Sequence, residues 1–294
     1  MSYEMWIIVT GALVGASCGV IGAFLILRKI AMLADAISHT VLLGIVLAFL
    51  VSHSMNGAFM LAGAVLVGLF TAFAVQLLNS GGIQEDASIG VVFTSLFALG
   101  VILISLYAKD VHLDVEHVLM GEIAFVPWET VSLLSFGELP KAFVMLGSIF
   151  LLDLLLITLF YKEFKITSFD PGMAAALGIP VLLIHYVLMV MVSVTSVAAF
   201  DSVGAILVVA MLIAPGATAY LLTDRYSAML LLSGGIGVLD STAGYFIAKA
   251  FDVSISGSMA VAAGIIFTLA WILSPRYGLL SRLFSRHAVH KLQR

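Results

Sequence analysis

Apolar residues occur along the chain in long continuous runs that short polar segments separate. A membrane-spanning helix needs about 20 apolar residues, and continuous rather than alternating apolar positions are typical of helices, not of barrel strands. The pattern predicts about nine spans, at 6–27, 30–52, 57–78, 87–107, 143–160, 180–199, 203–222, 228–249 and 257–274. Eight spans are the alternative, because the run from Val181 to Leu222 is interrupted only around Phe200 and Asp201.

Composition restricts the class of protein further. Of the 294 residues, 62% are hydrophobic and 10% are charged, whereas roughly 25% are charged in soluble domains. This composition excludes a soluble enzyme, a disordered protein and a nucleic-acid-binding protein. We therefore expect an all-α polytopic transmembrane helix bundle, with one transmembrane domain over residues 1–275 and a basic cytoplasmic tail over 276–294.

Basic residues indicate the orientation of the chain in the membrane. Ten of the thirteen follow odd-numbered spans: Arg28, Lys29, Lys162, Lys165, Arg225, Arg276, Arg282, Arg286, Lys291 and Arg294. With nine spans and the N-terminus outside, all ten lie on the cytoplasmic side. No basic residue precedes the first span, so we expect a retained helix rather than a signal peptide.

Two ionisable residues inside the second span, Asp35 and His39, are the candidate metal ligands. Their spacing of four residues puts both on one helix face. Counted from Arg28, they lie about 10 and 16 Å into a core about 30 Å thick. One carboxylate and one imidazole suit Mn²⁺, Fe²⁺ or Zn²⁺. A buried polar pair that only fixes the second helix to a neighbour is the alternative, because two ligands do not complete a coordination shell.

Other polar residues in the spans favour packing roles. Asp153 and Asp240 have no partner at helical spacing, so we expect each to make an interhelical hydrogen bond. Cys18, the single cysteine, excludes a disulfide and a cysteine-cluster metal site. The same helix carries a small residue in each turn, which lets another helix approach closely: Gly11, Gly15, Gly19 and Gly22.

An acidic segment follows the fourth span on the expected outer side. It contains Asp110, Asp114 and Glu116, and Glu122 extends it. His112 and His117 lie in the same segment, but five residues apart, which is not a same-face spacing. We interpret the segment as a hydrated acidic mouth that concentrates cations, and a metal cluster as the alternative.

A short helix is predicted at about 169–179, between the fifth and sixth spans. Asp170 is a good N-cap, Pro171 fits the first helical position, Gly178 can end the helix, and Pro180 stops it. Its small side chains indicate either a docking surface for another protein or a simple structured turn. The sequence contains no nucleotide-binding GxxxxGK[S/T] motif, so any ATP hydrolysis belongs to a partner.

Several stretches, in the same order, resemble the membrane permeases of bacterial ABC importers for manganese, zinc and iron. They are ADAISH at 34–39, EDASIG at 85–90, LMGE at 119–122, the segment 170–178, and VGAILVVAMLIAP at 203–215. The later spans are most similar to manganese permeases. Family members often have a proline shortly after the histidine, where this chain has Leu42, Leu43 and Gly44.

The resemblance implies a multi-pass permease of the bacterial cytoplasmic membrane, with Asp35 and His39 contacting the transported ion. It implies an ion path shared with a second permease subunit, identical or homologous. Two cytoplasmic ATPases and an extracellular metal-binding lipoprotein or periplasmic binding protein complete the importer. The coupling helix that contacts the ATPase maps onto Asp170, Pro171, Gly172, Ala174, Ala175, Leu177 and Gly178. No permanently bound cofactor is implied; manganese is the favoured cargo, with zinc or iron the alternatives.

A proton-coupled secondary metal carrier is the rival hypothesis. It would use Asp35, Asp153 and Asp240 as a relay and would need no ATPase. Such carriers carry internal repeats, and the sequence shows no convincing one. The residues do not decide which divalent ion is transported.

Overall fold

A computed structural model describes residues 2–53, 57–107, 123–133, 137–274 and 278 of the chain. Nine helices among these residues are long and apolar enough to cross a membrane. They are α1 (Tyr3–Leu27), α2 (Ala31–Ser52), α3 (Gly57–Ser80), α4 (Glu85–Tyr107), α6 (Lys141–Leu159), α9 (Val181–Val203), α10 (Ala205–Leu222), α11 (Tyr226–Phe251) and α12 (Ile255–Leu273). Every boundary falls within four residues of its predicted position, which confirms the nine-span prediction for the described part of the chain.

The break between α9 and α10 lies at Gly204, and not at the expected interruption around Phe200 and Asp201. Gly204 adopts φ 81° and ψ 161°, a conformation that is open to glycine because it has no Cβ atom. The polar residues at the end of α9 remain helical, so a single glycine separates the two spans.

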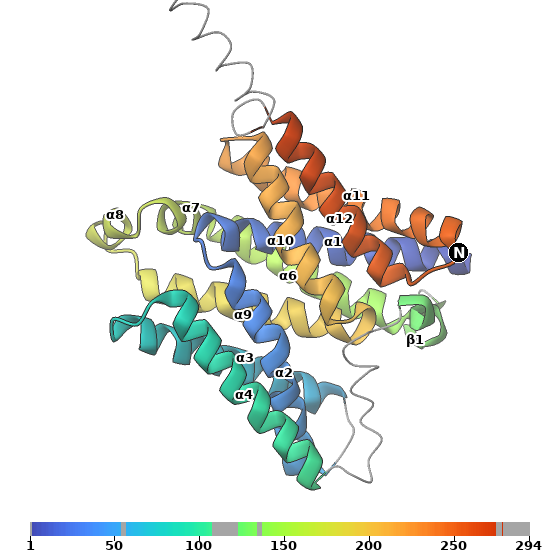
Figure 1. Cartoon of the computed structure of the whole chain (residues 1–294), viewed down its shortest axis with the longest axis horizontal. Helices are drawn as coiled ribbons and strands as arrows, with labels where there is room; N and C mark the ends of the chain where they lie inside the picture. Colours follow the sequence, from blue (N-terminus) through green and yellow to red (C-terminus); the bar gives the residue numbers. More distant parts are fainter. Residues whose placement is uncertain (1, 54–56, 108–122, 134–136, 275–277, 279–294) are drawn as a thin grey trace, which may run out of the picture.

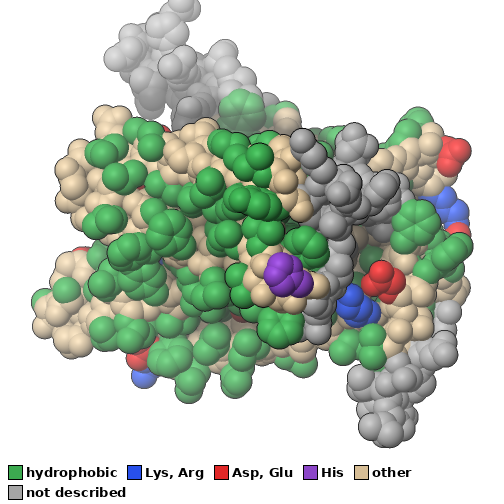
Figure 2. Space-filling model, turned by 90° about the horizontal axis from the view of Figure 1, so that it is seen from below, with side chains coloured by type: hydrophobic (Ala, Val, Ile, Leu, Met, Phe, Trp, Pro, Cys, Tyr) green, Lys and Arg blue, Asp and Glu red, His purple; other side chains and the backbone are tan. Residues whose placement is uncertain are grey.

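The long helices form two groups (Figure 1). In one group, α1 packs against α10 and α11, and α12 packs against the same two helices. In the other, α2 packs against α3 and α4, while α9 and α6 lie between the groups. Figure 2 shows one face of the molecule on which hydrophobic side chains predominate and few charged ones appear, as expected of a surface that contacts lipid.

The small residues of α1 allow close helix crossings, as predicted. A Cβ atom added to Gly15 would lie 2.2 Å from the carbonyl oxygen of Gly237 on α11. The Ser241 hydroxyl donates a hydrogen bond of 2.7 Å to the carbonyl oxygen of Gly11 at the same crossing. Cys18 is fully buried in α1, which agrees with its interpretation as a packing residue.

Short elements connect the spans at both ends of the bundle. At one end lie α7 (Tyr161–Phe169) and α8 (Pro171–Ala176), which we call the α8 end. At the other lie the 3-10 helix η1 (Ile123–Trp128) and an antiparallel hairpin of β1 (Thr130–Leu133) and β2 (Gly137–Pro140). Helix α8 was predicted from the sequence, with wider bounds, but α7 and the hairpin were not.

Candidate metal site

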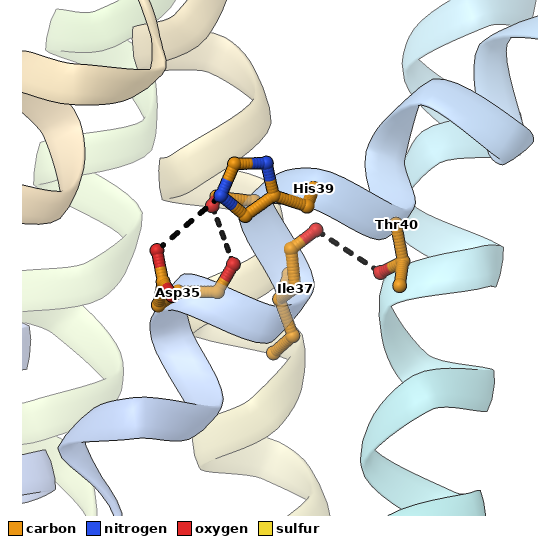
Figure 3. A network of polar contacts seen from close by, with 5 residues as sticks. Asp35, Ile37, His39 and Thr40 are labelled. Carbon is orange, nitrogen blue, oxygen red and sulfur yellow. Dashed lines mark hydrogen bonds and ion pairs between the residues drawn. The ribbon is translucent and has the colours of Figure 1, made fainter. Parts of the chain in front are cut away.

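Asp35 and His39 lie side by side on α2 (Figure 3). The distance from His39 Nε2 to Asp35 Oδ1 is 3.6 Å, and each side chain is about one third exposed. Ligand atoms that share one ion through bonds of about 2.1 Å lie roughly 3 to 3.4 Å apart. The two atoms are therefore close to the separation that one divalent ion requires, and both have access to a ligand.

Two aromatic rings from α4 support the imidazole of His39. Its ring centroid lies 5.2 Å from that of Phe93 and 5.8 Å from that of Phe97, the latter in an edge-to-face arrangement. These contacts restrict the rotation of the imidazole and exclude water from one of its sides. The two phenylalanines were not identified from the sequence, although their own spacing of four residues puts them on one helix face.

Hydroxyl groups hold the same segment of α2 against α3. The Thr71 hydroxyl on α3 donates to Thr40 Oγ1 at 2.9 Å. Thr40 in turn donates to the carbonyl oxygen of Ile37 at 3.1 Å (Figure 3). Both threonines are fully buried. Because Thr40 directly follows His39, this link fixes the height and rotation of the candidate ligand relative to α3. Segment 42–44, which lacks the family's proline, remains helical within α2.

The pair by itself does not form a complete metal site. Within the described residues, no group of three or more His, Cys, Asp or Glu side chains could hold a metal ion. The remaining coordination positions are thus left to water, backbone oxygens or another chain. The predicted acidic mouth, with Asp110, Asp114, Glu116 and Glu122, lies outside the described residues and stays a prediction.

Asp153 and Asp240, the two isolated acidic residues within the spans, differ in their hydrogen bonding. Asp153 on α6 is buried and accepts a hydrogen bond of 2.7 Å from the Thr195 hydroxyl on α9, which confirms the expected interhelical bond. Asp240 on α11 is fully buried, and neither carboxyl oxygen has a hydrogen-bond partner among the described residues. The prediction of an interhelical hydrogen bond is therefore wrong for Asp240, because no donor of the described residues lies within hydrogen-bond distance of its carboxyl oxygens.

The short helix α8 begins as the sequence predicted. Asp170 Oδ1 accepts a hydrogen bond of 2.9 Å from the backbone N–H of Met173, and Pro171 occupies the first turn. Gly178 follows the helix with φ 80°, which favours glycine at that position. Met173 and Leu177 are 56% and 62% exposed. These two side chains, four residues apart, form an exposed apolar surface. Met173 was not among the predicted docking residues.

Comparison with known proteins identifies the fold family. Residues 2–274 match the model of the family described as "ABC 3 transport family". The chain belongs to this ABC 3 family. It is a multi-pass membrane permease subunit of an ABC transporter, and as such it has no ATPase activity of its own. Membership excludes the secondary carrier that the sequence left open as a rival.

Individual relatives cover almost the whole chain. The manganese transport system membrane protein MntD of Bacillus subtilis (strain 168) is 63% identical over 282 residues, which are 96% of each chain. The zinc transport system membrane protein TroD of Treponema pallidum (strain Nichols) is 43% identical over 97% of this chain and 78% of its own. Among solved structures, PsaBC from Streptococcus pneumoniae in complex with Fab matches with a TM-score of 0.79. That match has 34% identity and covers 96% of this chain and 95% of the other.

Proposed function

We propose that this ABC 3 permease imports divalent metal ions, with manganese favoured over zinc or iron. The observation that carries the proposal is the pairing of Asp35 and His39, 3.6 Å apart on one accessible face of α2. Oxygen and nitrogen donors suit Mn²⁺, Fe²⁺ and Zn²⁺, and intrinsic affinity favours zinc. The higher identity to a manganese system than to a zinc system supports manganese as the physiological cargo.

In this proposal, the α8 end of the bundle faces the bacterial cytoplasm. Lys162 and Lys165 lie on α7, and Arg28 donates a hydrogen bond to Thr167 of the same helix. All three are therefore at the α8 end, and basic residues favour the cytoplasmic side of short loops. The N-terminus of α1 and the hairpin then face outward, and the basic tail over 276–294 lies inside.

Three kinds of partner complete the importer. Two ATPases bind the cytoplasmic face, and the exposed apolar pair of Met173 and Leu177 on α8 supports docking there. A second permease subunit supplies the metal ligands that complete the coordination shell begun by Asp35 and His39. An extracellular lipoprotein or periplasmic binding protein delivers the ion to the outer face.

Transport follows from the position of the pair within α2. A bare divalent ion cannot enter the hydrocarbon core, because its desolvation cost is prohibitive without compensating ligands. Asp35 offers a negative charge and His39 a neutral lone pair to replace part of the hydration shell. ATP-driven closure of the ATPases moves α8, and the permease then opens the ion path toward the cytoplasm.

The test compares uptake of radioactive manganese by cells that express the whole importer with wild-type or altered permease. Asp35→Ala and His39→Ala should each lower uptake about tenfold or more, since even outer-shell changes cost about 10- to 100-fold in metal affinity. His53→Asn is the matched control: His53 ends the same helix, is exposed and has φ 48°, which asparagine tolerates. Competition with Zn²⁺ and Fe²⁺ ranks the cargo. Normal uptake in both variants, at normal membrane amounts, would refute the assignment.

A further inference from the structure

The side chain of Arg28 makes two hydrogen bonds at the α8 end. It caps the C-terminus of α1, and its side chain reaches α7. Its Nη2 group donates to Thr167 Oγ1 at 2.9 Å, and its Nε group donates to Ser168 Oγ at 3.2 Å. One guanidinium thus binds two consecutive hydroxyls about 140 positions later in the chain, which only the tertiary fold brings within reach.

Aromatic rings make the same junction rigid. Phe24, one turn before Arg28, packs against Phe164 of α7 and Tyr226 of α11. Its ring centroid lies 5.2 Å from that of Phe164 and 5.9 Å from that of Tyr226. Tyr226 also contacts Tyr161 at 5.2 Å. Phe24 and Phe164 are fully buried. Because rings from α1, α7 and α11 interlock, α7 cannot shift without a corresponding shift at the end of α1.

The charged guanidinium of Arg28 donates its hydrogen bonds to neutral hydroxyl groups. No Asp or Glu of the described residues lies within ion-pair distance of it. Burial lowers the pKa of Arg28 to about 10, so the guanidinium is still protonated at neutral pH. Hydrogen bonds from a charged donor are stronger than neutral ones, and the planar fork of arginine can donate to two neighbouring hydroxyls at once.

The hydrogen bonds of Arg28 connect the segment just before α8 with the segment just before α2. Thr167 and Ser168 lie just before Asp170, the residue that caps α8. On the other side, only Lys29 and Ile30 separate Arg28 from the first residue of α2, and Lys29 has φ 62°, which makes a tight turn. Asp35 follows seven residues after Arg28. One side chain and one short turn therefore connect the segment before α8 with the start of α2.

We propose that Arg28 is a positioning residue that transmits movement of α8 to the metal pair on α2. The inference rests on the proposed function, in which α8 contacts the ATPase. It assigns Arg28 to coupling between ATP hydrolysis and transport, and not to metal binding or to ATP hydrolysis itself.

The experiment uses the complete importer reconstituted in liposomes, with Mn²⁺ as the transported ion. Transport and ATP hydrolysis are measured in the same preparation. Arg28→Gln should lower the number of ions transported per ATP about tenfold, because it replaces charge-assisted hydrogen bonds with weaker neutral ones. Arg28→Lys keeps the charge without the fork and should restore part of the ratio. Lys165→Gln, an exposed position on α7, removes an equal charge and should leave the ratio unchanged.

A second set of variants approaches the contact from α7. Thr167→Val combined with Ser168→Ala should lower the ratio as Arg28→Gln does, and adding Arg28→Gln should lower it no further. Equal losses of transport and hydrolysis, failure of both sets to assemble, or an unchanged ratio would each assign the contact a structural role and overturn the proposal. Failure of the proposed function looks different, because wild-type importer would then transport no Mn²⁺ at all.

Discussion

Gly237 of α11 lies so close to α1 that a single methyl group should separate the two helices. A Cβ atom there would be 2.0 Å from the carbonyl oxygen of Gly15, whereas an ordinary contact begins at about 3.4 Å. The obstacle is backbone, so no side-chain rotation relieves it. Overpacking of this kind costs about 1 to 3 kcal/mol. Separation also weakens the bond from Ser241 to Gly11, worth about 0.5 to 1.5 kcal/mol.

Together these losses predict that Gly237→Ala destabilises the folded permease by about 2 to 4 kcal/mol. At about 2 to 4 °C for each kcal/mol in a protein of this size, the melting temperature should fall by about 4 to 16 °C. The assay is thermal unfolding of the detergent-purified chain, followed by the loss of its monodisperse peak.

Gly235→Ala is the matched control on the same helix. Nothing lies within 4 Å of a Cβ atom added there, and alanine is the better helix former by about 1 kcal/mol. The melting temperature of the Gly235→Ala variant should equal that of the wild-type protein or exceed it. If Gly237→Ala melts at the same temperature as Gly235→Ala, the close crossing of α1 and α11 does not stabilise the fold.

Three further changes address the polar contacts. Thr195→Val removes the donor to the buried carboxyl of Asp153 and should cost about 1 to 3 kcal/mol, measured as a lower melting temperature; an unchanged value would show that the bond is not formed. Thr71→Val removes the bond to Thr40 and should reduce manganese uptake at low metal concentration, with normal uptake arguing against a role in orienting the metal pair. Asp170→Ala removes the α8 cap, worth about 1 kcal/mol of local helix stability. It should weaken co-purification of the ATPase without lowering the melting temperature of the bundle; a lower melting temperature would mean that α8 supports the whole fold.

The sequence alone predicted the features that depend on neighbouring residues. The spans follow from the length of each apolar run, because a backbone in lipid must satisfy its hydrogen bonds within its own helix. Asp35 and His39 were paired by helical periodicity, and the structure has them side by side. Asp170 was recognised as the N-cap of α8, with Pro171 at the first helical position, since capping involves only residues one turn away.

Tertiary structure decided every contact between helices. Asp153 and Asp240 both lack a partner at helical spacing, yet one meets Thr195 from α9 and the other meets no donor among the described residues. The acceptors of Arg28 and the rings beside His39 likewise come from distant segments. Which side chains meet depends on the rotation and pairing of whole helices, set by packing such as the close crossing of α1 and α11. A helix's own sequence identifies its polar residues, but only the packed bundle determines their partners.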